Sequence, residues 1–135
     1  MTTYTDDDTR TIEARADVES LETLHHERRV LLKVLAPLKA MHGSFGMFDA
    51  KRKQMTRAMM VRARDAIKKR GEKATEPMIE AEALNDPQYL AWLDQQLADR
   101  IEFIARQTEL DEIEERIRSR ELELQAYNAE LRLQR

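Results

Sequence analysis

Residues 87–133 read PQYLAWLDQQLADRIEFIARQTELDEIEERIRSRELELQAYNAELRL, with no glycine and, after Pro87, no proline. Asp86 and Pro87 form a helix start signal, because aspartate caps an N-terminus and proline fits the first turn. The stretch predicts one helix, which at 1.5 Å per residue is about 70 Å long. Two apolar seams run along it, and their change of phase near residue 104 predicts that the buried face rotates there or that different partners pack before and after it. The first seam holds Leu90, Leu93, Leu97, Ile101 and Ile104; the second holds Phe103, Leu110, Ile117, Leu124 and Leu131 at intervals of seven, with Ile113 and Tyr127 beside them.

A helix of this length carries more apolar surface than a small monomer can cover. We expect the preceding helices to fold back along part of it as a helical hairpin. The far end, from Ile113 to Leu131, then needs another cover, and heptad spacing is typical of helices that pair with a second copy of the chain. Arg120 falls in this seam, where we expect it to be solvated or ion-paired. The predicted oligomerisation residues are Leu110, Ile113, Ile117, Leu124, Tyr127 and Leu131.

The composition is typical of an all-α protein. The 135 residues are 36% charged and 5% aromatic, with three glycines, three prolines and no cysteine, which favours long helices and excludes a disulfide framework or a thiolate metal site. We expect a flexible acidic tail over 1–10 and a single helical domain over 11–135. The expected fold is a helical hairpin with a long C-terminal helix that forms a coiled-coil-like oligomer. The expected elements are a helix at 11–42, a basic helix at 50–70, a short helix at 76–84 and the long helix at 87–133.

The first expected helix has leucines at intervals of seven, Leu24, Leu31 and Leu38. Pro37 lies inside this pattern and should kink the helix or end it a turn early. The loop that follows, HGSFGMFD at 42–49, contains two aromatic residues, Phe45 and Phe48. They could pack in the core, stack on a base or contact a neighbouring subunit.

Residues 51–73 read KRKQMTRAMMVRARDAIKKRGEK and carry ten basic residues against two acidic ones, a net charge of +8. Because the whole chain is −3, the remainder carries −11. Asp49 is a suitable N-cap, apolar residues recur at helical spacing from Met55 to Ile67, and Gly71 predicts the end of the helix. Charge this segregated indicates a polyanionic partner. The predicted DNA-binding residues are Lys51, Arg52, Lys53, Arg57, Arg62, Arg64, Lys68, Lys69, Arg70 and Lys73.

These cations differ in whether their positive charge has a structural role in the helix. Lys68, Lys69 and Arg70 also complement the macrodipole at the helix end. The others have no evident structural role: Lys51, Arg52, Lys53, Arg57, Arg62 and Arg64. Few aromatic residues accompany them, so the pattern predicts salt-sensitive binding of single-stranded nucleic acid without base readout. The alternative is a helical scaffold or adaptor whose basic helix pairs with acidic protein surfaces, among them the run from Asp111 to Glu115.

No catalytic constellation is visible, since no nucleophile accompanies a base and no metal-ligand spacing occurs. We therefore expect a protein that is not an enzyme and that needs no cofactor or metal. Trp92 is expected to pack against other helices. No apolar run approaches the roughly 18 residues that span a bilayer, and the N-terminus, MTTYTDDDTR, is unlike a signal peptide. We expect no membrane partner and a location in the cytoplasm, that of the host cell if a phage encodes the chain.

The order of these parts resembles the phage recombination mediators of the UvsY type. The resemblance covers most of residues 50–128. Arg62-Ala63-Arg64 stands where the family has a basic–Ala–Arg element, and Ile117-Arg118-Ser119-Arg120 matches its basic–Ser–Arg element. The family's tyrosine pair is absent; Ile67 and Lys68 occupy roughly that place. The resemblance implies a mostly helical single-stranded-DNA-binding protein that forms ring-like homo-oligomers through C-terminal helices. It also implies two protein partners, a RecA-like recombinase and the single-strand-binding protein that the mediator helps to displace.

Overall fold

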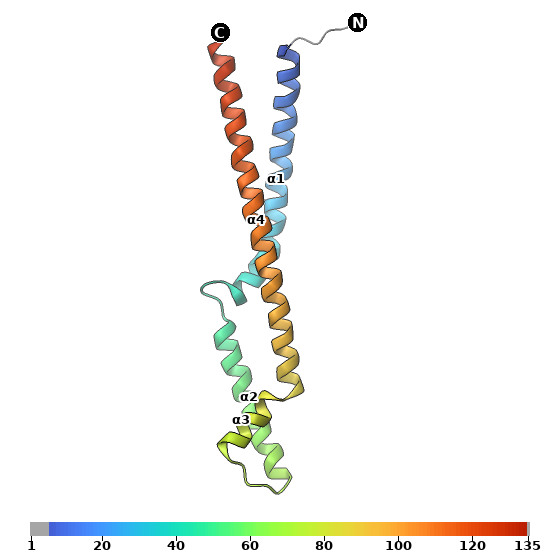
Figure 1. Cartoon of the computed structure of the whole chain (residues 1–135), viewed down its shortest axis with the longest axis vertical. Coiled ribbons are helices and arrows are strands. Elements are labelled where there is room, and N and C mark those ends of the chain that lie inside the picture. Colours follow the sequence, from blue (N-terminus) through green and yellow to red (C-terminus); the bar gives the residue numbers. More distant parts are fainter. Residues whose placement is uncertain (1–5, 135) are drawn as a thin grey trace. The chain divides into compact units, whose positions relative to one another are not determined.

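The computed structural model describes the backbone of residues 6–134 and the side chains of residues 21–134. These residues form four helices and no strand, which confirms the all-α class (Figure 1). The helices are α1 (Asp6–His42), α2 (Phe48–Lys69), α3 (Glu76–Leu84) and α4 (Pro87–Leu133). The contacts group into two compact units, one made of residues up to Leu35 with those from Ala105, the other of Ala36–Ile104. The single helical domain expected over 11–135 stays a prediction.

Two helix starts differ from the expected ones. α1 begins at Asp6, so residues 6–10 are helical and not part of a tail, while residues 1–5 of the predicted tail lie outside the described residues. The acidic run Asp6–Asp8 favours this start, because negative charge complements the N-terminal end of the helix dipole. α2 begins at Phe48, so Asp49 lies in its first turn and Met47 is the N-cap, without a side-chain hydrogen bond. Pro37 does not end α1, which continues to His42.

Other helix ends follow the local signals. Gly71 has φ +77°, and α2 closes there with two backbone hydrogen bonds, from Gly71 N to Lys68 O at 3.0 Å and from Glu72 N to Ile67 O at 3.3 Å. This pattern is a Schellman motif, in which glycine adopts the left-handed conformation at little steric cost. At the start of α4, Asp86 Oδ1 accepts a hydrogen bond from Gln88 N at 2.9 Å, so Asp86 caps the helix as predicted.

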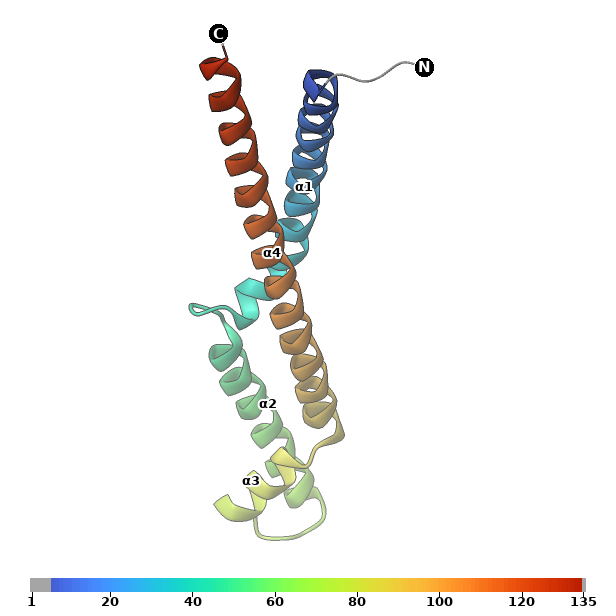
Figure 2. The same ribbon diagram turned by 45° about the horizontal axis from the view of Figure 1, so that its top comes forward.

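The core of the Ala36–Ile104 unit lies where α2, α3 and the start of α4 meet (Figure 2). The expected apolar face of α2 is buried, with Ile67 completely inaccessible to solvent. Tyr89 of α4 closes the cluster at 5% exposure. The buried residues of this core are Met59, Ala63, Ile67, Ile79, Ala83 and Tyr89. Burying this cluster fixes the orientation of α2, so its opposite face points to solvent.

In the other unit, α1 and α4 lie side by side and antiparallel (Figures 1 and 2). Leu24 of α1 is buried against Ile113 and Ile117 of α4, and Arg28 Nε lies 3.4 Å from Glu114 Oε1. The expectation that the far seam from Ile113 onward needs another copy is therefore wrong for Ile113 and Ile117. They are covered because α1 runs along α4 as far as these two residues and packs Leu24 against them.

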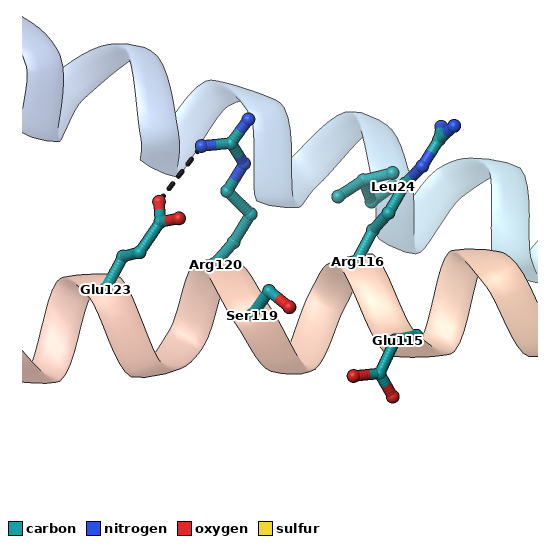
Figure 3. A pocket seen from close by; sticks show the side chains of 6 residues that line it. All are labelled: Leu24, Glu115, Arg116, Ser119, Arg120 and Glu123. Atoms are coloured by element: carbon teal, nitrogen blue, oxygen red, sulfur yellow. Dashed lines mark hydrogen bonds and ion pairs between the residues drawn. The ribbon is translucent and has the colours of Figure 1, made fainter.

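The seam becomes polar at Arg120, as expected. Arg120 Nη1 lies 3.0 Å from Glu123 Oε2 (Figure 3). Together with Arg116 and Ser119, these side chains border a hollow of about 390 Å³ beside Leu24. The charged pair and the hollow lie next to the apolar contact that Leu24 makes with Ile113 and Ile117.

Candidate nucleic-acid interface

The ten predicted DNA-binding residues all lie on the exposed surface of α2 or directly after it. Eight belong to the helix itself, Arg70 is its C-cap, and Lys73 lies in the link to α3. Because α2 packs through Met59, Ala63 and Ile67, the cations cannot turn inward without breaking the core. The structure therefore brings the predicted residues together on one rigid element, and it divides them into two groups by their partners.

Three arginines are held by carboxylates and an amide of the segment that follows α2. Arg62 donates to Gln88 Oε1 at 2.7 Å and lies 3.6 Å from Asp86 Oδ2. Arg64 lies 3.4 Å from Glu76 Oε1. Arg70 makes two hydrogen bonds to Glu82, at 2.9 and 3.0 Å, and lies 3.6 Å from Glu72 Oε2. These ion pairs tie α2 to the segment around α3.

The pairs correct one part of the prediction. Arg62 and Arg64 were expected to have no structural role, and both are ion-paired within the unit. At Arg70, the hydrogen bonds to Glu82 and the charge of that carboxylate raise the pKa of the guanidinium above its usual value. Arg70 is thus a fixed positive charge whose field Glu82 already offsets.

The remaining predicted DNA-binding residues are not neutralised by a close ion pair with another described residue. Six of them form no ion pair with any other described residue: Lys51, Lys53, Arg57, Lys68, Lys69 and Lys73. Arg52 makes only a long contact of 3.9 Å to Asp49. Near the start of α2, Arg52, Lys53 and Arg57 also line a shallow hollow of about 300 Å³ with Thr56. This end of α2 combines unneutralised charge with a concave surface, which suits a phosphate backbone.

The two loop aromatics have different environments. Phe48 is half-buried, and its ring is parallel to that of Trp92, with a 1° interplanar angle and 5.9 Å between centroids. Trp92 also lies near Tyr89, so it packs within the unit as expected. Phe45, in contrast, is fully exposed at 102%. Of the three roles that the sequence allowed for Phe48, the structure shows packing within the unit, against Trp92.

The first seam predicted on α4 is wrong. α4 turns Tyr89, Trp92 and Gln96 toward α2, and only Leu93 of the predicted seam is half-buried. The other four seam residues form an exposed row, here named the α4 stripe: Leu90 at 44%, Leu97 at 59%, Ile101 at 61% and Ile104 at 57%. Sequence analysis identified these residues as an apolar row but wrongly expected the row to be buried. The buried face holds Tyr89, Trp92 and Gln96, which are spaced by three and four residues. Because Gln96 and the tyrosine hydroxyl are polar, this row does not stand out as apolar in the sequence.

The predicted oligomerisation residues also divide into two groups. Leu110, Ile113 and Ile117 are buried within their own unit, at 6–8% exposure. Leu124 and Tyr127 are half-buried, and Leu131 is exposed. Of the predicted oligomerisation residues, the last part of the seam therefore keeps apolar surface that its own unit does not fully cover.

Within residues 21–134, no three histidine, aspartate or glutamate side chains are placed to hold a metal ion. None of the helices in the described part of the chain is both long enough and apolar enough to cross a bilayer.

Protein-family models, curated proteins and solved structures give no significant match to this chain.

Proposed function

We propose that the chain is a non-enzymatic, single-stranded-DNA-binding recombination mediator. In this role it assembles as a homo-oligomer and helps load a RecA-like recombinase onto DNA coated with single-strand-binding protein. The observation that carries the binding part is the set of six cations on and just after α2 that have no ion-pair partner among the described residues. The recombinase and the single-strand-binding protein enter through the resemblance to mediators of the UvsY type.

The spacing of the cations supports binding along a strand. Lys53, Arg57 and Lys68 recur at intervals of four and eleven, which puts them on one face of α2. Phosphates attract such charges whatever the base, so the expected binding is independent of sequence. Since the core holds α2 in place, little of the binding free energy is spent on ordering the helix.

Homo-oligomerisation is supported by two apolar surfaces. One is the α4 stripe, and the other is the end of the seam at Leu124, Tyr127 and Leu131. A closed ring requires a heterologous contact, in which two different patches of each copy meet. A chain with two separate apolar surfaces meets that requirement, and repeating α2 around the ring would extend the row of cations.

The binding part is tested by fluorescence anisotropy of a labelled oligothymidylate over a series of salt concentrations. Six cations on six phosphates predict that the logarithm of the binding constant falls with the logarithm of salt with a slope of about −4. Failure to bind at low salt would refute the proposal. The mediator part is tested by adding the protein to a strand coated with single-strand-binding protein and following recombinase assembly, which should become faster.

A second candidate is a helical scaffold whose basic helix binds acidic protein surfaces. The pairs that Arg62, Arg64 and Arg70 make with carboxylates favour it, because they show α2 engaging acidic groups. On this reading, charge reversal at Lys51, Lys53 and Arg57 dissociates the oligomer. On the first reading the same variant keeps its mass in light scattering and loses DNA binding.

A further inference from the structure

The loop between α1 and α2 is a tight turn that leaves little freedom to its backbone. Gly46 N donates to Gly43 O at 2.9 Å, which places Ser44 and Phe45 at the corner of a β-turn. Met47 N donates to Ala40 O at 2.9 Å and fastens the loop to the end of α1. A Cβ atom at Gly46 would collide with Met41 O, so the close approach of the backbone requires glycine there. The corner residue is therefore held in a defined place.

Phe45 gains nothing from this position within its own unit. Its side chain is fully exposed, and it makes no ring contact with the other described aromatics. Burial of a phenylalanine side chain is favourable, and Phe45 leaves that stabilisation unused. Phe48, three residues later, is packed against Trp92, so the loop does have an apolar site nearby and Phe45 does not use it. In both views the loop projects away from the helices next to it (Figures 1 and 2).

The same loop leads directly into the unpaired cations. Lys51 N donates to Met47 O at 2.9 Å, so the first turn of α2 continues from the loop without a break. Lys51, Lys53 and Arg57 follow within the first three turns and have no partner among the described residues. An exposed aromatic ring followed closely in the chain by unpaired cations offers the two kinds of group with which proteins hold single strands, the ring for a base and the cations for phosphates.

We propose that Phe45 is a base-stacking residue, on which one nucleobase of a bound single strand stacks while adjacent phosphates contact the cations at the start of α2. The inference rests on the proposed nucleic-acid binding and adds to it a defined contact point for a base. Stacking on phenylalanine accepts any base, which agrees with binding that is independent of sequence.

The test compares three variants by anisotropy over the salt series. Phe45→Ala should weaken binding by about 5- to 150-fold at every salt concentration, since stacking is worth roughly 1–3 kcal/mol per base. The slope should not change, because no charge is removed. Phe45→Trp should restore affinity. Met47→Ala, which truncates another exposed apolar side chain of the same loop, should stay within about twofold of the wild type.

A spectroscopic signature separates stacking from a structural effect. In a Trp92→Phe background, Phe45→Trp supplies the single tryptophan of the chain, and its emission should be quenched as the strand is added. If the wild type binds and Phe45→Ala binds equally well, the stacking proposal is wrong and the proposed function stands. If Phe45→Ala instead lowers the molar mass in light scattering, Phe45 is a subunit contact and the stacking proposal is again wrong. If the wild type does not bind, the proposed function itself fails.

Discussion

Replacing Lys51, Lys53 and Arg57 together by glutamine tests whether the unpaired cations, and not the paired ones, carry DNA binding. Each phosphate contact on a single strand contributes about 0.7 to the salt slope, so losing three should change it from about −4 to about −2. For a fourfold rise in salt, the wild type should lose about 250-fold in affinity and the variant about 16-fold. Helix content should not change, because none of the three side chains has a partner among the described residues.

The matched control replaces Arg62, Arg64 and Arg70 by glutamine, which removes the same charge from the same helix. Carboxylates already lie within 2.9–3.6 Å of these guanidinium groups, so their contribution to the slope should be well under that of the first triple. Ion pairs between exposed side chains contribute little to stability, so this variant should also unfold at only a slightly lower denaturant concentration. Anisotropy and circular dichroism measure the two effects. Equal slopes for the two triples would refute the division of the cations by their partners.

Three further predictions concern the fold and the assembly. Ile67→Ala should destabilise the protein by about 2–5 kcal/mol in urea unfolding, since the side chain is fully buried, whereas Val61→Ala on the exposed side of α2 should cost under about 0.5 kcal/mol; similar losses would contradict the assigned core. Gly71→Ala should cost about 1–2 kcal/mol because φ is +77°, and Gly71→Asn should recover part of it; an unchanged unfolding midpoint for Gly71→Ala would argue against the left-handed turn. Leu97→Asp combined with Ile101→Asp should lower the molar mass in light scattering with helicity unchanged, and an unchanged mass would exclude the α4 stripe as a subunit contact.

The parts of the fold that local chemistry decides were predictable. Asp86 with Pro87 defines the start of α4 through one capping bond, and Gly71 defines the end of α2 through its left-handed conformation. Both signals depend on residues within one turn of the helix end, so no tertiary contact is needed to recognise them. The start of α1 was harder, because a run of aspartates is compatible with a polar tail and with a helix N-terminus.

The face that α4 buries was not predictable from its periodicity. Its Leu and Ile residues at 90–104 have helical spacing, but periodicity says only that a face is apolar, not which neighbour covers it. In this unit α2 packs on the face with Tyr89 and Trp92, where Gln96 is also buried. The pairs of Arg62 and Arg64 escaped prediction for a related reason, because they depend on how α3 returns against α2. Likewise, the sequence alone does not show that the Phe45 ring is exposed while the Phe48 ring packs against Trp92.

The arrangement of cations on α2 determines how affinity should depend on the length of the bound strand. Lys53 and Arg57 lie near one end of the helix and Lys68 near the other, while Arg64 between them is already bound to Glu76. The fifteen residues from Lys53 to Lys68 span about 22 Å, which a stacked strand covers in about six or seven nucleotides. Oligonucleotides shorter than this can occupy only one end of the helix. Affinity should therefore rise in a step, not gradually, as the strand becomes long enough to bridge both ends.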